Sequence, residues 1–143
     1  MKKDDCIFCK IANGEIPSDT VYEDENFRVI LDLNPVEKGH ALIIPKEHYA
    51  DITELKDPYL STVLALAAKV GKVQMKALHC DGFNVVQNNG EAAGQSVRHF
   101  HVHVIPRRLP KEGPVKVVWQ PHPSDPEEQK KIAETLRSSF AEA

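Results

Sequence analysis

Residues 99–105, His-Phe-His-Val-His-Val-Ile (HFHVHVI), decide how the rest of the chain is organised, because three of its seven histidines alternate there with apolar residues. On a strand, successive side chains point to opposite faces, and neighbours on one face lie about 6.5–7 Å apart. The stretch therefore predicts one row of imidazoles (His99, His101 and His103) opposite a row of apolar side chains in the core. A strand that faces solvent needs no particular polar residue, so we interpret the imidazole row as the lining of a functional site.

The segments around this stretch predict an α+β fold. Extended segments are expected at 20–24, 27–33, 39–45, 82–87 and 99–105, each bounded by Gly, Pro, Asn or a charged turn. Helical patterns occupy 7–12, 58–78 and the C-terminal end, where Ser124-x-x-Glu127 fits a capping box. The expectation is an antiparallel sheet of about five strands with one long helix and shorter N- and C-terminal helices.

The two longer helices each carry an apolar face. In the C-terminal helix the face consists of Ile132, Leu136 and Phe140. The face predicted for the 58–78 helix comprises Leu60, Val63, Leu64, Ala67, Val70, Gly71 and Leu78. The long helix is expected to pack against the apolar row of the histidine stretch, Phe100, Val102 and Val104.

Composition excludes several classes of protein. The chain has 143 residues, 41% of them hydrophobic and 27% charged, as in a soluble globular domain of ordinary size. A net charge of −3 offers no basic surface for nucleic acid, and no apolar run approaches a membrane span. The N-terminus does not resemble a signal peptide, and an odd count of three cysteines argues against a disulfide framework. We expect a cytoplasmic protein.

Two chemistries fit a row of histidines. A His-x-His pair can chelate zinc, and an imidazole can also act as a nucleophile or an acid–base group. The preceding residues 90–97, GEAAGQSV, add backbone amides together with Gln95 and Ser96. Such hydrogen-bond donors suit an oxyanion such as a phosphate, whereas a pure metal site does not need them.

At this point the residues resemble a family. GQSVRHFHVHVIPR, residues 94–107, resembles the signature of the histidine triad (HIT) nucleotide hydrolases and transferases, and residues 99–105 match every position of its pattern. CIFCKIANGEIP, LDLNPVEKGHALIIPKEH and GFNVVQNNGEAAGQS resemble family segments in the same order. The resemblance covers about residues 5–108. It implies a single HIT domain over 1–143 with a HIT-like fold, in which about 109–143 form a C-terminal extension.

The resemblance also implies a mechanism. His101 would be the nucleophile that attacks the α-phosphorus and forms a nucleotidyl-histidine, which water then hydrolyses to the 5′-monophosphate. His103 would contact the phosphate, and Ser96 would assist the leaving group.

Further residues would surround the substrate, by the same resemblance. Gln95, Gly94 and Asn88 would line the phosphate pocket, Asp32 would accept hydrogen bonds from the ribose, and His40 would support the hydrogen bonding of the site. The base would lie between Ile7, Phe8, Ile11 and Leu33. An apolar sandwich distinguishes bases weakly, so a purine is an expectation, and these four residues can equally be read as plain core.

Cys6-x-x-Cys9 has the spacing of a zinc-binding pair. In zinc-bearing family members two histidines complete the set, and they correspond to His48 and His99. A closed Cys2His2 set would hold one structural zinc per chain. The alternative is a pair of reduced cysteines without a metal.

The sequence is thus interpreted as a homodimeric HIT hydrolase acting at the α-phosphate of nucleoside 5′-phosphate conjugates. Phosphoramidates, acyl-adenylates and dinucleoside polyphosphates all remain possible substrates. Pairing through the 58–78 helix and an edge strand is implied by the resemblance. Two rivals are a zinc-dependent hydrolase that uses the triad as metal ligands and a non-enzymatic nucleotide-binding or scaffolding protein.

Overall fold

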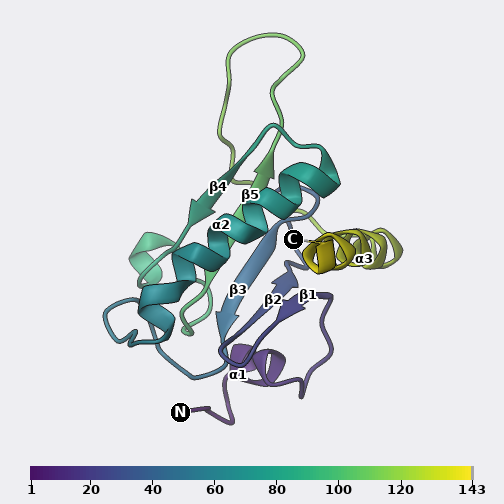
Figure 1. Cartoon of the computed structure of the whole chain (residues 1–143). Helices are drawn as coiled ribbons and strands as arrows, with labels where there is room; N and C mark the ends of the chain where they lie inside the picture. The colour runs from purple at the N-terminus through teal and green to yellow at the C-terminus, as the bar shows by residue number, and fades with distance from the viewer. Residues whose placement is uncertain (143) are drawn as a thin grey trace.

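Five strands form one antiparallel sheet in the order β1-β2-β3-β5-β4 (Figure 1). The computed structural model describes residues 1–142. The strands are β1 (Thr20–Glu23), β2 (Phe27–Leu31), β3 (Ala41–Pro45), β4 (Gly82–Val86) and β5 (Val102–Arg107). The helices are α1 (Ile7–Ala12), α2 (Tyr59–Leu78), α3 (Pro126–Glu142) and the short 3₁₀ helix η1 (Glu91–Ala93). The predicted α+β class is confirmed.

The two faces of the sheet are covered by different helices. Helix α2 crosses one face, and α3 packs beside it against β1 (Figure 1). The main core lies between these helices and the sheet, and it includes Val29, Ile43, Val70 and Leu136. A smaller apolar cluster lies on the opposite face, where Phe8 and Ile11 of α1 pack against it. The imidazole row lies on this second face.

The histidine stretch is only partly a regular strand, which corrects the predicted boundary. Strand β5 begins at Val102, where the register pairs Val102 with Ile43 of β3. Further toward the N-terminus the ladder is interrupted, because the Phe100 N–H donates to the Tyr49 carbonyl and the Pro45 carbonyl faces the His99 ring. The alternation of faces nevertheless continues, with Phe100 in the main core and the histidines on the other side.

The predicted apolar face of α2 is confirmed for Val63, Ala67, Val70 and Gly71, which are buried, but not for its outer residues. Leu60 and Leu64, which were expected in the core, are 49% and 70% exposed. Gly71 allows a close approach to β4, because a Cβ atom there would lie 2.2 Å from the Phe83 ring. The buried face also includes Tyr59, Leu66, Val73 and Gln74, so its centre is turned away from Leu60 and Leu64. An apolar stripe is therefore left on the outer side of α2.

The C-terminal extension returns to the sheet before α3. The Ser124 hydroxyl, predicted to cap the helix, donates instead to the Leu33 carbonyl at 2.7 Å. The predicted apolar face of α3 is confirmed, because Leu136 and Phe140 are buried in the main core and Ile132 packs against it. Among residues 1–142, the helices are all too short or too polar to cross a membrane.

Candidate active site and metal centre

The imidazole row is buried between the sheet and α1. His99, His101 and His103 are 0%, 4% and 6% exposed. Phe8 of α1 meets the His101 ring edge-on, with 5.0 Å between ring centroids. Burial penalises a charged imidazole, and it lowers the pKa of His101 below the ordinary value. The ring is therefore neutral at neutral pH.

The hydrogen bond of His101 fixes which ring nitrogen is free. Its Nδ1 lies 2.7 Å from the His99 carbonyl oxygen, which can only accept, so Nδ1 carries the proton. Nε2 of a neutral ring then holds an unshared electron pair. This is the form of imidazole that acts as a nucleophile.

His103 is oriented through His40 by a chain of hydrogen bonds. The Val36 N–H donates to Nδ1 of His40 at 3.1 Å, so the His40 proton lies on Nε2, which donates to Nδ1 of His103 at 2.9 Å. Burial lowers the pKa of His40 to about 4 and that of His103 to about 3, so both rings are neutral. The remaining proton of His103 is on Nε2. A neutral hydrogen-bond donor thus lies beside the free Nε2 of His101.

Asp32 lies at the His103 end of the row. One carboxylate oxygen accepts the Asn34 N–H at 2.9 Å, and the other is 3.8 Å from Nε2 of His40. Because His40 is neutral, that contact is not an ion pair. Burial raises the pKa of the Asp32 carboxyl, while the bond from Asn34 opposes the rise. The carboxylate remains partly exposed and can accept hydrogen bonds from a ligand.

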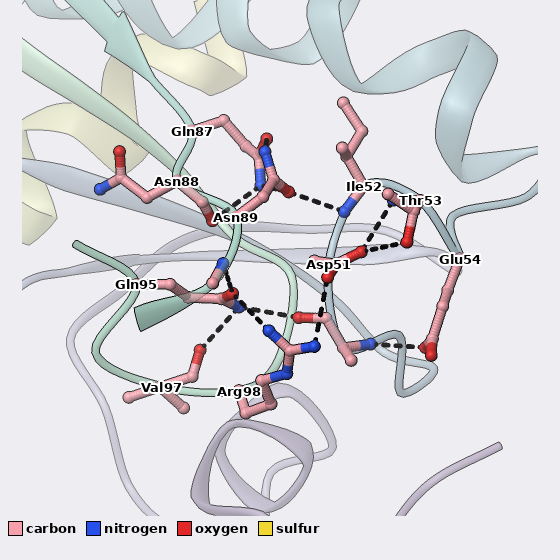
Figure 2. Close-up of polar contacts among 12 residues, drawn as sticks. Asp51, Ile52, Thr53, Glu54, Gln87, Asn88, Asn89, Gln95, Val97 and Arg98 are labelled. Carbon is pink, nitrogen blue, oxygen red and sulfur yellow. Dashed lines mark hydrogen bonds and ion pairs between the residues drawn. The ribbon is translucent and has the colours of Figure 1, made fainter. Parts of the chain in front are cut away.

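The loop before the triad is held by the Gln95 side chain (Figure 2). Its oxygen accepts the Gly90 N–H at 2.7 Å, and its nitrogen donates to the carbonyls of Ala50 (2.7 Å) and Val97 (3.0 Å). Both ends of the amide are therefore engaged with backbone, and Gln95 is buried. The Gln95 side chain therefore holds the loop conformation at the place where the resemblance puts the phosphate pocket.

Around Gln95, the other predicted phosphate-binding residues are more accessible. Ser96 and Gly94 are exposed, and Asn88 is partly exposed with its amide directed away from the hydrogen bonds around Gln95 (Figure 2). Gly94 has a φ of 93°, a left-handed conformation that favours glycine, and it packs next to the Asn88 amide. Ser96 lines a cavity of ≈ 570 Å³ together with Cys6, Ile7 and His48. Ser96 thus lies toward the His99 end of the row, opposite Asp32.

Two further contributions were missed from the sequence. Asn89 accepts the Ile52 N–H at 2.8 Å and ties the loop to the segment after β3, as does the ion pair between Arg98 and Asp51 at 3.3 Å (Figure 2). Polar residues in a loop give no sign of such long-range partners.

Trp119 of the extension was also missed, although it lies 4.8 Å from His103 between ring centroids.

The residues expected around a base divide into two pairs. Phe8 and Ile11 pack against the smaller apolar cluster, as plain core residues would. Ile7 and Leu33 are 51% and 68% exposed, so neither is a core residue. Ile7 lines the cavity that contains Ser96, and Leu33 lines a separate hollow with Pro123 and Gln129 near the start of α3.

Cys6, Cys9, His48 and His99 converge although they come from three distant segments. Their ligand atoms all lie within 4.8 Å of one another, and the sulfur–nitrogen distances from Cys6 to His99 and from Cys9 to His48 and His99 are each 3.4 Å. A tetrahedral zinc with ordinary bond lengths has edges of about 3.4–3.8 Å. The spacing of these atoms therefore fits the ion.

The surrounding hydrogen bonds fit a metal centre as well. Nε2 of His99 donates to the Pro45 carbonyl at 2.9 Å, which leaves Nδ1 unprotonated toward the two sulfurs. The Cys9 N–H donates to Sγ of Cys6, and the Lys3 N–H donates to Sγ of Cys9. Burial raises the pKa of the Cys9 thiol, so a nearby cation is needed to stabilise the thiolate. The residues present thus suit zinc.

The triad does not converge on one catalytic metal. Within the described residues, the two groupings at metal-binding distance each contain a single triad histidine, His99 in one and His103 in the other. In the second grouping, the facing nitrogens of His40 and His103 already share a hydrogen bond, and His101 directs Nδ1 at backbone. This arrangement argues against a hydrolase that uses the triad as metal ligands.

Comparisons with known proteins give matches over most of the chain. The model of the HIT domain matches residues 13–109. The chain is 43% identical over 135 residues to an adenosine 5′-monophosphoramidase of Schizosaccharomyces pombe, covering 94% of this chain and 98% of that protein. It is 42% identical over 106 residues to an adenylylsulfatase of Arabidopsis thaliana, covering 74% of this chain and 54% of that protein. A solved structure, a zinc-bound histidine triad family protein of Mycobacterium smegmatis, is 36% identical, with a TM-score of 0.85 over 96% of this chain and 94% of that one.

Proposed function

The chain belongs to the HIT domain family, and from this membership and the site geometry we propose that it hydrolyses nucleoside 5′-phosphate conjugates at the α-phosphate through a nucleotidyl group on His101. The observation that carries the proposal is the fixed tautomer of His101. Its Nδ1–H is held by the His99 carbonyl at 2.7 Å, which leaves Nε2 free to attack phosphorus. The neighbouring Nε2–H of His103 can donate a hydrogen bond to a phosphate oxygen.

The first step forms a covalent intermediate. The electron pair of His101 Nε2 attacks the α-phosphorus, and the bond from phosphorus to the leaving nitrogen or oxygen breaks with its electron pair. The departing atom takes a proton through the Ser96 hydroxyl, which regains one from water. The ring keeps its Nδ1 proton and becomes cationic, and the His99 carbonyl stabilises that charge. The nucleophile thus replaces water in the harder displacement.

The second step releases the product. Water attacks the same phosphorus, the electron pair of the P–Nε2 bond returns to the ring, and the proton of the water passes to solvent. His103 donates from Nε2 to a phosphate oxygen in both steps. The products are a nucleoside 5′-monophosphate and a neutral His101, ready for another cycle.

The orientation of the substrate follows from the two ends of the row. Asp32 and His103 belong to one cluster, so the ribose lies there, whereas Ser96 lies toward His99 and faces the leaving group. Ile7, Phe8, Ile11 and Leu33 hold the base, with Asn88, Gly94 and the loop kept in place by Gln95 around the phosphate. The two relatives described above are named for adenosine phosphoramidate and adenylyl sulfate chemistry. Adenosine 5′-phosphoramidate is therefore the first substrate to test.

A panel of substrates tests the activity directly. Purified protein is incubated with adenosine 5′-phosphoramidate, its guanosine counterpart, an acyl-adenylate and a diadenosine polyphosphate, and monophosphate release is followed by chromatography. We expect AMP from the phosphoramidate, and the guanosine compound measures base preference. Binding of AMP without release of monophosphate from any compound would favour a non-enzymatic nucleotide-binding protein.

Zinc belongs to the structure rather than the reaction in this proposal. Cys6, Cys9, His48 and His99 fill a tetrahedral shell, which leaves no coordination position for substrate. The ion would join α1 to the segments before β5 and after β3. Thiolate ligands persist in a reducing compartment, in keeping with the expected cytoplasmic location.

A homodimer is the proposed assembly. The outer side of α2 exposes Leu60, Leu64 and Met75, and β4 is an edge strand on which Val85 is 41% exposed. A second copy could cover this helix and extend the sheet across β4. Sedimentation at micromolar concentration should give a dimer, and Leu64→Glu should give a monomer. Leu109→Glu, at an exposed position of the extension, is the matched control and should leave the dimer intact.

A further inference from the structure

Trp119, the single tryptophan of the chain, lies on the imidazole pair that orients the phosphate donor. Its ring meets His103 edge-on, with centroids 4.8 Å apart and planes at 85°, and it meets His40 at 5.6 Å and 77°. His40 and His103 are almost completely buried, whereas Trp119 is 45% exposed. The indole thus stands between the shared hydrogen bond of the two histidines and solvent.

The extension that carries Trp119 is tied to the segment that orients His40. Between β5 and α3 the chain forms a long loop that projects past the sheet and then returns (Figure 1). On its return, the His122 N–H donates to the Pro35 carbonyl at 3.3 Å, and the Gln129 side chain donates to the Asp32 carbonyl at 2.6 Å. The Val36 N–H, one residue after Pro35, is the donor that sets the His40 tautomer. The same short segment, Pro35–Val36, therefore holds both the extension and the His40 ring.

We propose that Trp119 is a positioning residue of the active site, which shields the His40–His103 hydrogen bond from water and thereby keeps Nε2–H of His103 directed at the phosphate. The inference rests on the proposed function for its kinetic consequence. A ring is required because edge-to-face packing on two imidazoles covers them while leaving their nitrogens free for each other. Val117, two residues earlier, is 69% exposed, whereas Trp119 is 45% exposed. Trp119 is therefore more covered than a nearby apolar residue of the same loop.

Water entering beside His103 would give Nδ1 a competing donor. The ring could then rotate or exchange tautomers, and the proton on Nε2 would no longer be fixed. Because this proton is needed most where charge develops on the phosphate, its loss should lower kcat more than it raises KM. The residue thus acts through His103 and does not itself take part in bond making.

The fluorescence of the single tryptophan tests the contact without turnover. His103→Ala should move the emission of Trp119 to longer wavelength in ligand-free protein, because the indole loses the imidazole ring packed against it and gains contact with water. Lys76→Gln, on the outer side of α2, is the control and should leave the spectrum unchanged. An unshifted spectrum in His103→Ala would overturn the contact, whatever the enzymatic activity.

Kinetics with adenosine 5′-phosphoramidate test the role. Trp119→Ala should lower kcat by about threefold to tenfold, the scale of one lost aromatic pair, with KM changed less than twofold. Trp119→Phe should restore most of the rate, and the matched control Val117→Ala should equal wild type. A rate in Trp119→Ala equal to that of Val117→Ala overturns the inference. Inactive wild-type protein would contradict the proposed function instead, and the fluorescence shift would still decide the contact.

Discussion

His99 and His101, neighbours on the imidazole row, are the same side chain in opposite tautomers. At one end, Nε2 of His99 is bonded to the Pro45 carbonyl, so Nδ1 faces Cys6 and Cys9 as a metal ligand. Two residues later, Nδ1 of His101 is bonded to the His99 carbonyl, so Nε2 is the free nitrogen. The alternation of the strand places both rings on one face, but the backbone acceptor that each ring meets decides what it can do. His99 therefore suits a structural metal centre, and His101 suits nucleophilic chemistry.

Replacing His101 should produce the largest effect, and it should affect turnover without affecting the metal centre. In His101→Ala, turnover of adenosine 5′-phosphoramidate should fall by about a thousandfold or more, because the attacking group is lost. AMP affinity should change only a few-fold by calorimetry, since Asp32, Ser96 and His103 remain. Zinc content and thermal stability should match wild type. His79→Ala, at an exposed position outside the site, is the control. Retention of substantial turnover in His101→Ala would assign the nucleophile elsewhere.

Breaking the metal end should affect stability before chemistry. Cys9→Ser should abolish the one zinc per chain found by elemental analysis. If the lost centre is worth about 3 kcal/mol, a chain of this length should lose about 6–12 °C in Tm. Cys80→Ala is the matched control, because Cys80 is also buried and free but lies outside the cluster. A metal-free Cys9→Ser protein with unchanged Tm would remove zinc from the account of the fold.

The His40–His103 pair should leave a smaller signature in the pH dependence of stability. Burial lowers the pKa of these histidines to about 4 and about 3, whereas unfolded histidine titrates near 6.5. The unfolded chain therefore binds more protons below pH 6.5, so the free energy of unfolding is full above that pH and falls as the solution becomes acidic. Each such group contributes a slope of up to about 1.4 kcal/mol per pH unit.

Urea unfolding between pH 6.5 and 4.5 measures this slope. His103→Gln removes one titrating group, so its stability should fall less steeply than that of wild type, by up to about 1.4 kcal/mol per pH unit. Acid release of zinc affects both proteins alike and cancels in the difference. Val117→Gln, at an exposed position without a titrating side chain, should keep the wild-type slope. Equal slopes in wild type and His103→Gln would mean that the pair is not held neutral.

The sequence predicted the site better than the packing that supports it. The period of a strand and the Cys-x-x-Cys spacing are local rules, so the shared face of His99, His101 and His103 could be derived from them, and the family resemblance supplied His48. The exposure of Leu60 and Leu64 on α2 could not be derived, because it depends on which side of the helix meets the sheet. The placement of Trp119 beside His103 could not be derived from the sequence either, because Trp119 lies in a coil segment without hydrophobic periodicity.

Gln95 illustrates the same limit within the site. The family resemblance implies that Gln95 lines the phosphate pocket, but it does not reveal that the amide is engaged by the backbone of Ala50, Gly90 and Val97. The partners come from segments that only the folded chain brings together. A residue type thus indicates which chemistry is available, and the long-range hydrogen bonds decide where that chemistry is used.

The central claim is that His101, and no other histidine of the row, carries the nucleotidyl group. Wild-type protein mixed with adenosine 5′-phosphoramidate should be quenched in alkali, because acid cleaves a phosphoramidate bond, and then digested and analysed by mass spectrometry. The account predicts an adenylyl group on the peptide that contains residues 99–105, with fragmentation placing it on His101. An adduct on His99 or His103, or turnover with no adduct in rapidly quenched samples, would contradict the account.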